Sequence, residues 1–366
     1  MPFLLDDDHR QIVQEAERVL SDGWSPDGLR HLLERVGAHD DRFWTTCRDM
    51  GWTGITISED HGGLGLGPIA LCLTAEVVGR FVGGAPFLST GYGVSEALRR
   101  FGSNDQQGRY LAGLANGERT GAIDLTSALD GGERLAWTDG RLSGATGLVA
   151  AGAWADLLVT VARDTATGGD VLVLVALDEQ AHPEPVQTFD NSRGYAVLHF
   201  NSAPAEVLAT EHAGDAALEL LARVAVIVAF EQLGGAEACM ERARNFANER
   251  QAFGQPIGKF QAIKHRIAEM YVANELARGN ALRAALSLRD DAGDLVLRAG
   301  AARLTAIDAY EFAATEAIQT HGAIGITWEH DLHLFFRRSR ALALELGGRG
   351  PWQDVVARRV IAGVAA

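Results

Sequence analysis

Apolar side chains recur at helical spacing along the first third of the chain. In residues 7–20 the apolar positions lie three and four residues apart, at Ile12, Val13, Ala16 and Val19. This spacing places the side chains on one face of an α-helix. Similar patterns predict further helices at 43–50, 69–80, 89–101 and 105–114. We therefore expect residues 1–118 to form an N-terminal helical domain.

The period of the pattern changes after residue 118. Three short apolar runs rich in Val and Leu occur at Leu157–Val161, Val171–Leu177 and Val197–Asn201. Clusters of Gly and Asp separate them, as expected of short strands joined by turns. Residues 119–205 are therefore predicted to form a central β domain, a barrel or a sandwich.

Helical periodicity returns after residue 205. Residues 218–232 are apolar almost all round, which is typical of a buried helix. Three more helices are predicted at 263–286, 295–319 and 351–362. Residues 206–366 thus read as a four-helix bundle domain, and the whole chain as an α+β protein ordered helices, strands, helices.

Composition narrows the function classes. The chain has 366 residues, 47% of them hydrophobic, and a formal net charge of -15. This charge argues against a nucleic-acid or acidic-membrane surface. The three cysteines show no C-x-x-C spacing, so neither a disulfide framework nor a zinc site is indicated. The sequence lacks a signal peptide and a bilayer-spanning run, so we expect a cytoplasmic protein without a membrane partner.

The stretch R-Q-A-F-G-Q-P-I-G-K-F-Q at 250–261 connects two of the predicted helices. Helical periodicity is broken there by Gly254, Pro256 and Gly258. The stretch also carries a guanidinium at Arg250, a ring at Phe253 and an amide at Gln261. A guanidinium binds phosphate bidentately, and glycine lets backbone approach a ligand. Taken alone, the motif favours a capped helix turn with a solvated arginine.

Three other stretches accompany this motif in a familiar order. They are E-D-H-G-G-L-G-L-G at 59–67, A-E-V-V-G-R at 75–80 and Q-T-H-G-A-I-G-I-T-W-E-H-D at 319–331. Together with R-x-x-F-G-x-P-I-G-x-F-Q they resemble the acyl-CoA dehydrogenase family of flavoproteins. The resemblance implies FAD as cofactor, an acyl-CoA thioester as substrate, and α,β-dehydrogenation as the reaction.

The resemblance also implies roles for residues of the two C-terminal motifs. Arg250 would pair with the FAD diphosphate, while Phe253 and Gln261 would pack against and hydrogen-bond the cofactor of a neighbouring subunit. The subunit-contact motif Q-x-x-G-G-x-G is matched by Gln319, Gly322 and Gly325, with Ala323 replacing its second glycine. These matches imply a homodimer, a homotetramer or a heterotetramer.

The stretches that meet the flavin ring in the family are altered here. Thr126 matches the hydroxyl of T-E-P-x-x-G-S, but Ser127 and Ala128 replace the acid and the proline. Leu148–Ala150 stands where the family has W-I-T or W-I-S. The ring site of this chain is therefore expected to differ from that of its relatives.

The catalytic base of the family is a carboxylate that removes the α-proton of the thioester. Its usual position reads Leu346 here, with Glu345 one residue earlier, and a second position used in the family reads Val224. Three alternatives stay open. Glu345 serves after a local register change; another carboxylate, Glu231 or Glu329, serves instead; or the chain lacks a base. For Glu345 alone, a solvated or salt-bridged role competes with catalysis.

Base-less subunits occur in this family, in heteromeric actinobacterial enzymes that shorten steroid side chains. The sequence thus predicts a FAD-dependent acyl-CoA dehydrogenase, with the base-lacking subunit of a heterotetramer as the specific hypothesis. A flavin monooxygenase of the same fold and a scaffold homologue without flavin are the alternatives.

Two further clusters have a functional and a structural interpretation. His330 and His333 lie three residues apart, but no third ligand follows at a recognised spacing, so a polar helix start capped by Thr327 or Asp331 is favoured over a metal site. The basic run Arg337, Arg338 and Arg340 either meets a phosphate of CoA or FAD, or faces solvent beside acidic partners.

Overall fold

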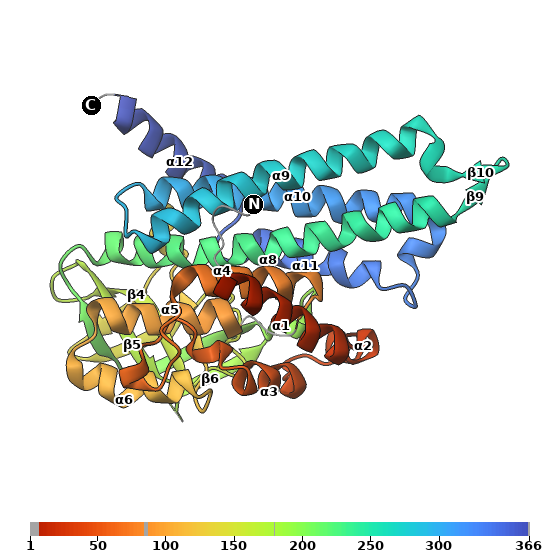
Figure 1. Cartoon of the computed structure of the whole chain (residues 1–366). Helices are drawn as coiled ribbons and strands as arrows, with labels where there is room; N and C mark the ends of the chain where they lie inside the picture. Colours follow the sequence, from red (N-terminus) through yellow and green to blue (C-terminus); the bar gives the residue numbers. More distant parts are fainter. Residues whose placement is uncertain (1–6, 84–86, 179, 365–366) are drawn as a thin grey trace.

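The computed structural model describes residues 7–83, 87–178 and 180–364. Short helices, a curled sheet and a layer of long helices follow one another along the chain, and the sheet lies below one end of the long helices (Figure 1). This order confirms the α+β prediction and its sequence of helices, strands and helices.

Side-chain caps mark the start of three of the six N-terminal helices, the second, the third and the sixth. The six helices are α1 (Asp7–Gly23), α2 (Pro26–Leu33), α3 (Asp41–Asp49), α4 (Gly67–Arg80), α5 (Phe87–Phe101) and α6 (Asn104–Ala115). Asp40 accepts a hydrogen bond from the backbone N–H of Phe43 at the start of α3, and Ser103 forms a capping box with Gln106 at the start of α6. Helix α2 was not predicted, because eight residues are too few for a clear period.

The sheet has the strand order β6-β7-β3-β2-β4-β5-β8, with β1 paired in parallel to β4. Its strands are β1 (Gly121–Asp124), β2 (Leu135–Thr138), β3 (Arg141–Ala145), β4 (Leu157–Asp164), β5 (Asp170–Ala176), β6 (Ala181–Pro185), β7 (Ala196–Pro204) and β8 (Glu206–Ala209). The three predicted strands are β4, β5 and β7.

Strand β4 is apolar on both faces because each face packs on a different core. Leu157 and Val159 belong to the core shared with the helices. Leu158, between them, belongs to a smaller core inside the curled sheet. Side chains alternate along a strand, so this double burial explains why the run lacked an alternating pattern in the sequence.

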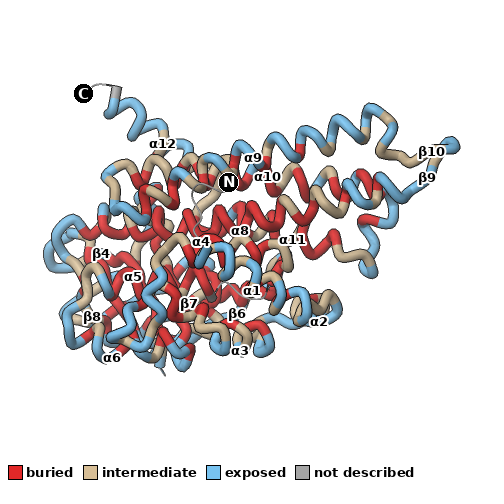
Figure 2. Tube along the Cα trace, viewed as in Figure 1, coloured by how far each residue is buried: buried red, intermediate tan, exposed pale blue. Residues whose placement is uncertain are grey.

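The long C-terminal helices are α8 (Ala213–Glu249), α9 (Gln261–Arg289), α10 (Leu295–His321), α11 (Leu332–Leu344) and α12 (Arg349–Val364). The centre of α8 is buried all round, as its composition predicts (Figure 2). Helix α11, which was not among the four predicted bundle helices, packs along α10 and α8. Helix α12 touches α10 near Gly300 through Trp352 and Val356, and its end points away from the other helices (Figure 1).

Two glycines allow α8 to cross α4 at close range. A Cβ atom on Gly234 would lie 1.8 Å from the carbonyl oxygen of Glu76, and one on Gly79 would lie 1.9 Å from that of Glu231. No other residue fits either position without moving a helix. The crossing fixes Glu231, which lies within the same turn of α8 and belongs to the buried charge cluster described below.

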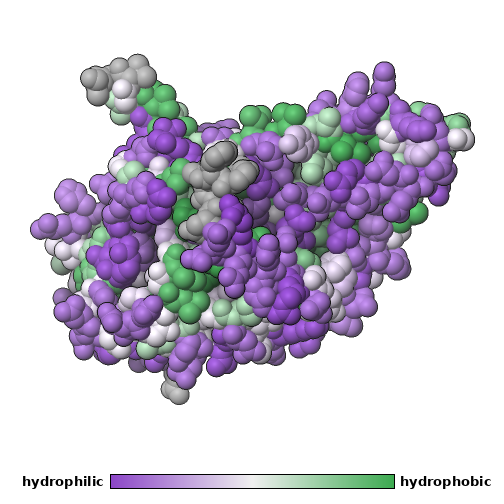
Figure 3. Space-filling view, viewed as in Figure 1, coloured by the Kyte–Doolittle hydropathy of each residue, from purple (hydrophilic) through white to green (hydrophobic). Residues whose placement is uncertain are grey.

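None of the helices in the described ranges combines the length and the apolar character needed to cross a membrane. The outward face of α9 nevertheless carries large apolar side chains, Val272 and Leu276, that are 55% and 65% exposed. Figure 3 shows hydrophobic side chains over α9 and at the β9–β10 tip, among other hydrophobic areas on the same face.

Candidate active site

A cavity of about 880 Å³ opens where the sheet meets the helices. One wall consists of β1 and the residues that follow it, including Asp124 and Thr126. Another wall is the segment between α11 and α12, including Glu345 and Leu346. Helices α5 and α8 contribute Thr90 and Leu221. Three large apolar side chains on the cavity are strongly exposed: Leu148, Phe189 and Leu344.

The cavity brings together several of the ring-contact and base positions that the sequence singled out. Thr126, Leu148, Ala150, Glu345 and Leu346 all line it. The second base position, Val224, is instead 1% exposed within the helical core and does not line the cavity.

Leu346 has an unusual backbone conformation. Its φ is +63°, and Gly347 after it has a φ of +85°. Left-handed backbone is uncommon for a residue other than glycine. The Leu346 carbonyl accepts a hydrogen bond of 2.9 Å from the indole N–H of Trp352, which holds the turn in place. The turn therefore presents an isobutyl group to the cavity at the position that the sequence analysis matched to the catalytic base.

The neighbouring carboxylate, Glu345, is held in an ion pair. Arg193 donates from Nε to Glu345 Oε2 at 3.1 Å and from Nη2 to Oε1 at 2.6 Å. The hydroxyl of Tyr195 donates to Oε2 at 2.8 Å. Both carboxylate oxygens are thus engaged, and Glu345 is 7% exposed. The geometry favours the salt-bridged interpretation of Glu345 over that of a base.

This ion pair belongs to a larger buried cluster. Arg193 also contacts Glu231 at 2.8 Å, and Arg338 contacts Glu231 at 3.0 Å and Asp190 at 2.5 Å. Burial alone would lower the pKa of Arg193, but Glu231 and Glu345 together raise it. For Asp190, burial acts to raise the carboxyl pKa, and the charge of Arg338 overcomes it, so that the pKa is lowered.

Arg303 completes the cluster from α10. Its guanidinium donates to the carbonyl oxygens of Leu342 and Glu345, which orients the end of α11. Burial lowers the pKa of Arg303 to about 10, and the charge of Glu345 opposes that shift. Arg193, Arg303 and Arg338 are balanced by Asp190, Glu231 and Glu345, so six buried charges sum to zero.

Neither alternative carboxylate of the sequence analysis is a free group on the cavity. Glu231 pairs with Arg193 and Arg338 and does not line the cavity. Glu329 is exposed and lies before α11, where Arg30 donates to its backbone carbonyl at 2.8 Å.

The three arginines of the basic run have different surroundings. Arg338 lies in the buried cluster, and Arg340 pairs with Glu311 at 2.5 Å at the cavity. Arg337 donates to the carbonyl of Phe189 at 3.1 Å. Arg338 and Arg340 therefore pair with acidic side chains, as the structural interpretation predicts. That interpretation also placed the run in solvent, and this part is wrong for Arg338, which is buried.

The predicted cofactor residues of the connector lie far from this cavity. The connector forms β9 (Gln251–Ala252), β10 (Gln255–Pro256) and the turn η4 (Ile257–Lys259), a hairpin at the distal tip of the long helices (Figure 1). Arg250 and Gln261 are exposed, and Phe253 is 95% exposed. Leu221 and Arg250 are 29 residues apart on α8 and its C-cap, which corresponds to about 43 Å.

The second predicted cofactor motif lies at the same end of the bundle. The rings of Phe246 on α8 and His321 on α10 stack with centroids 4.1 Å apart, which brings the two helix ends together. Gln319 is exposed there, and Gly322 has φ +64° and ψ −143°, a conformation almost confined to glycine. A Cβ on Gly325 would lie 2.9 Å from the carbonyl oxygen of Ile318.

The two histidines of the W-E-H-D-L-H stretch have structural roles. His333 Nε2 lies 3.0 Å from the carbonyl oxygen of Trp328, and His330 packs edge-on against His321. Asp331 precedes α11 without a capping hydrogen bond, and pairs with Arg30 at 2.6 Å instead. Across the described residues, no group of three His, Cys, Asp or Glu side chains is arranged to hold a metal ion.

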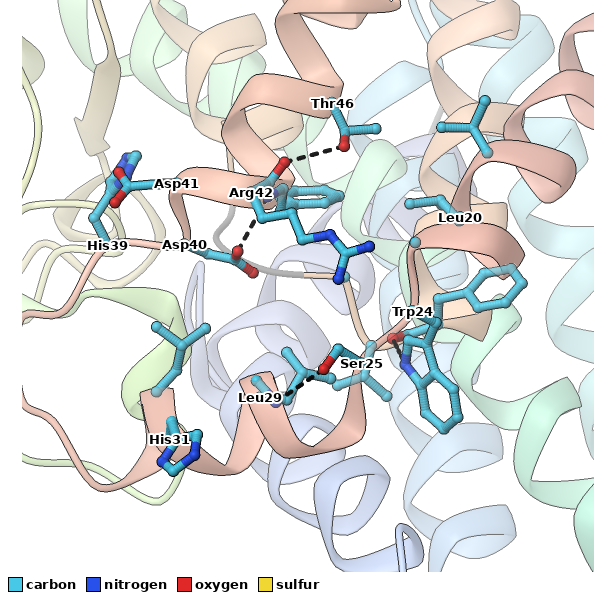
Figure 4. Close-up of a pocket in the computed structure, with 18 of the residues that line it drawn as sticks. Leu20, Trp24, Ser25, Leu29, His31, His39, Asp40, Asp41, Arg42 and Thr46 are labelled. Atoms are coloured by element: carbon cyan, nitrogen blue, oxygen red, sulfur yellow. Dashed lines mark hydrogen bonds and ion pairs between the residues drawn. The ribbon is translucent and has the colours of Figure 1, made fainter.

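A second cavity, of about 310 Å³, lies between α1, α2 and α3 (Figure 4). Three of its polar groups cap helices or bind backbone: Ser25 accepts from the N–H of Gly28, Asp40 from that of Phe43, and the Trp24 indole donates to the Phe81 carbonyl. These bonds account for Ser25, Asp40 and Trp24 without a ligand.

Asp124 is a polar residue of the main cavity that was not singled out from the sequence. Asp124 ends the buried strand β1 and follows Ile123, which is 6% exposed. Burial raises the pKa of the Asp124 carboxyl to about 6, and the backbone N–H of Gly147 opposes this shift. The available signal was an acid at the end of an apolar strand, two residues before Thr126.

Comparison with known proteins identifies the family. Residues 6–118 match the acyl-CoA dehydrogenase N-terminal domain, and residues 214–361 match the acyl-CoA dehydrogenase C-terminal domain. The chain is 30% identical over 338 residues to acyl-CoA dehydrogenase IpdE2 of Mycobacterium tuberculosis, covering 92% of each protein. It is 34% identical over 316 residues to acyl-CoA dehydrogenase FadE34 of the same organism, covering 86% of this chain but 41% of FadE34. The chain thus spans less than half of that relative.

Solved structures share the whole fold. A Tcur3481–Tcur3483 steroid ACAD variant superposes with a TM-score of 0.89 at 25% identity, covering 98% of this chain and 99% of that one. The ChsE4–ChsE5 complex of Mycobacterium tuberculosis gives a TM-score of 0.88 at 22% identity, covering 99% of each chain. FAD is the cofactor expected in this fold. The chain belongs to the acyl-CoA dehydrogenase family of flavoprotein oxidoreductases.

Proposed function

We propose that this chain is one subunit of a hetero-oligomeric, FAD-dependent acyl-CoA dehydrogenase, and that its own cavity lacks the catalytic base. The observation that carries the proposal is the state of the carboxylates around Leu346. The base position holds an isobutyl group, and the adjacent Glu345 is bound on both oxygens by Arg193. A general base needs a free lone pair within reach of the proton that it removes.

Asp124 does not replace the missing base in this proposal. In an anti elimination the proton and the hydride leave from opposite faces of the Cα–Cβ bond. Asp124 shares its wall with Thr126, the residue matched to the flavin contact, whereas Leu346 belongs to the α11–α12 segment. An acid beside the hydride acceptor is on the wrong face to take the α-proton.

The distant hairpin supports a shared site. Arg250 lies about 43 Å from Leu221 along α8. An extended dinucleotide with its ring in the cavity of this chain is too short to reach Arg250 of the same chain. The hairpin residues are also exposed and available to another subunit. We infer that Arg250, Phe253 and Gln261 contact a FAD bound in the partner.

The residues at the hairpin end fit the FAD diphosphate and its surroundings. Arg250 offers a bidentate donor, and Gly254 and Gly322 leave backbone uncovered, since a Cβ on either would meet no atom within 4 Å. Gln261 and Gln319 offer amides for hydrogen bonds. FAD, when bound, accepts a hydride from the acyl group. The residues of this chain hold and orient it, and the partner supplies the carboxylate.

Names of relatives are consistent with a two-protein enzyme. Two similar structures each carry the names of two proteins, Tcur3481–Tcur3483 and ChsE4–ChsE5. FadE34 is more than twice as long as the stretch that this chain matches, which leaves room for a second unit of similar size. A cytoplasmic location and the absence of nucleic-acid partners stay predictions from the sequence.

The test is the flavin content and turnover of the chain alone and co-expressed with an adjacently encoded homologue. We expect flavin absorbance and acyl-CoA-dependent bleaching only in the co-expressed complex. In that complex, Glu345→Gln should keep the ability to exchange the substrate α-proton, while neutralising a partner carboxylate should abolish it. Flavin and bleaching with the chain alone would contradict the proposal, and no flavin in either preparation would favour a scaffold.

A further inference from the structure

Within the described residues, the cavity contains one partly buried carboxylate that no cationic side chain pairs with. Four carboxylates line the cavity. Glu345 is paired with Arg193, and Glu311 with Arg340 and Arg349. Asp130 is exposed to solvent. Asp124 is partly buried, and within the described part of the chain no Arg, Lys or His forms an ion pair with it.

The surroundings of Asp124 make this charge costly. Ile123 and Leu125 on either side are 6% and 1% exposed, and strand β1 packs in parallel on the buried strand β4. Burial is the main cause of the raised pKa of Asp124. A hydrogen bond from the backbone N–H of Gly147 acts in the opposite direction and lowers the pKa. A buried carboxylate without a sufficient set of donors is destabilising. The same group becomes favourable when a ligand brings a donor to it.

We propose that Asp124 is the polar recognition point of the cavity, accepting a hydrogen bond from an N–H or O–H group of the bound ligand. Most of the remaining lining surface is apolar, with Leu148, Phe189, Leu221 and Leu344 facing the same space, which favours a mainly apolar ligand. Apolar walls bind without orienting, whereas one placed polar group fixes orientation and specificity. Asp124 therefore selects against ligands of equal shape that lack the donor.

Two ligand groups have this chemistry. The isoalloxazine ring carries an imide N3–H, and Asp124 stands two residues before Thr126, which matches a flavin contact. An acyl group with a hydroxyl carries an O–H, and Thr90 and Leu221 extend the cavity away from the β1 wall. The role proposed for Asp124 rests on the proposed function only in the choice of flavins and acyl-CoA thioesters as test ligands.

The experiment compares matched ligands on the purified chain. Binding of riboflavin is compared with binding of N3-methylriboflavin, and binding of octanoyl-CoA with that of hydroxyoctanoyl-CoA isomers, by calorimetry. We expect at least a tenfold preference for the donor-bearing member of one pair. Which pair shows the preference identifies the source of the donor. This comparison needs no variant and is independent of folding effects.

The matched variants are Asp124→Leu, which removes the acceptor at similar size, and Asp130→Asn, which neutralises the exposed carboxylate of the same cavity. Asp124→Leu should abolish the preference while keeping affinity for the donor-free ligand, and Asp130→Asn should change neither. Equal affinity for both members of each pair, or no binding of any ligand, would overturn the proposal. If the chain showed a ligand preference but no co-expressed complex contained flavin, the role of Asp124 would stand. The proposal that the chain is a dehydrogenase subunit would then be rejected.

Discussion

Arg193 holds both carboxylate oxygens of Glu345, at 3.1 and 2.6 Å, across 152 residues of chain. The pair joins the turn before β7 to the segment between α11 and α12, which forms one wall of the cavity. Glu345 also receives the Tyr195 hydroxyl at 2.8 Å. Glu345 therefore lies beside the predicted position of the catalytic base for a structural reason, because it anchors this wall of the cavity.

Glu345→Gln tests this role through stability. The change leaves Arg193 buried with one carboxylate, Glu231, and an incompletely compensated charge. Breaking a buried ion pair costs about 3–5 kcal/mol, so we expect a loss of that size in the free energy of unfolding, measured by urea denaturation. Glu311→Gln is the control, because its partners Arg340 and Arg349 are each 41% exposed and the loss should stay below about 1 kcal/mol.

Unchanged stability of Glu345→Gln, together with loss of α-proton exchange in the loaded enzyme, would instead identify Glu345 as the base. The structural role and the catalytic role thus predict different results in both measurements.

The α4–α8 crossing gives a second prediction. Gly234→Ala places a Cβ 1.8 Å from the carbonyl oxygen of Glu76, so one helix has to move. We expect a loss of about 3–5 kcal/mol in the free energy of unfolding or an insoluble protein. Gly279→Ala is the matched control on exposed α9, where a Cβ meets nothing within 4 Å, and should gain about 0.5–1 kcal/mol. Equal midpoints for the two variants would mean that the helices do not cross at this distance.

The sequence predicted what local periodicity encodes. The apolar circumference of α8 and the Val-rich strands β4 and β5 are continuous features, so their type and order followed from their period. The turn at 250–261 followed from Gly254 and Pro256. Its exposure and its distance from the cavity did not, because they depend on the length and direction of α8.

The buried charge cluster could not be predicted from the sequence either, because it depends on how distant segments pack together. Asp190, Arg193, Glu231 and Arg338 are separated by up to 148 residues, and no spacing rule links them. Arg338 looked like part of an exposed basic run because Arg337 and Arg340 flank it. Only the packing of α11 against the η3 turn (Asn191–Arg193) shows that it points inward, where it is 1% exposed. Asp124 was hidden in the same way, since its surroundings come from β4 and the α11–α12 segment.

Asp124 predicts a pH dependence of stability. The folded state raises its pKa from 3.8 to about 6, so the folded state binds the proton more tightly than the unfolded state. The stability contributed by the protonated carboxyl is fully present below about pH 4 and is lost as the pH rises through about 6. The full shift corresponds to about 3 kcal/mol, and water in the cavity reduces the expectation to about 1–2 kcal/mol.

The measurement is urea denaturation of the wild type and Asp124→Asn at pH 4 and pH 8. We expect Asp124→Asn to be more stable by about 1–2 kcal/mol at pH 8, with the difference vanishing at pH 4. Asp130→Asn, on the exposed carboxylate of the same cavity, should show no such trend. A constant difference between wild type and Asp124→Asn at both pH values would show that the carboxyl is not desolvated.

The hairpin gives the last prediction, which separates cofactor binding from folding. Arg250→Lys keeps the charge but loses the bidentate fork that matches a diphosphate, and Phe253→Ala removes a ring that is 95% exposed. Neither side chain supports the fold of its own chain, so the unfolding midpoint of the isolated chain should be unchanged. The flavin-to-protein ratio of the co-expressed complex should fall for both, with at least a tenfold weaker affinity for added FAD in Arg250→Lys. Arg283→Ala, an exposed arginine near the other end of α9, should leave the ratio intact. If Arg250→Lys kept full flavin content while Arg283→Ala lost it, the cofactor would have to be held at the opposite end of the helices from the hairpin.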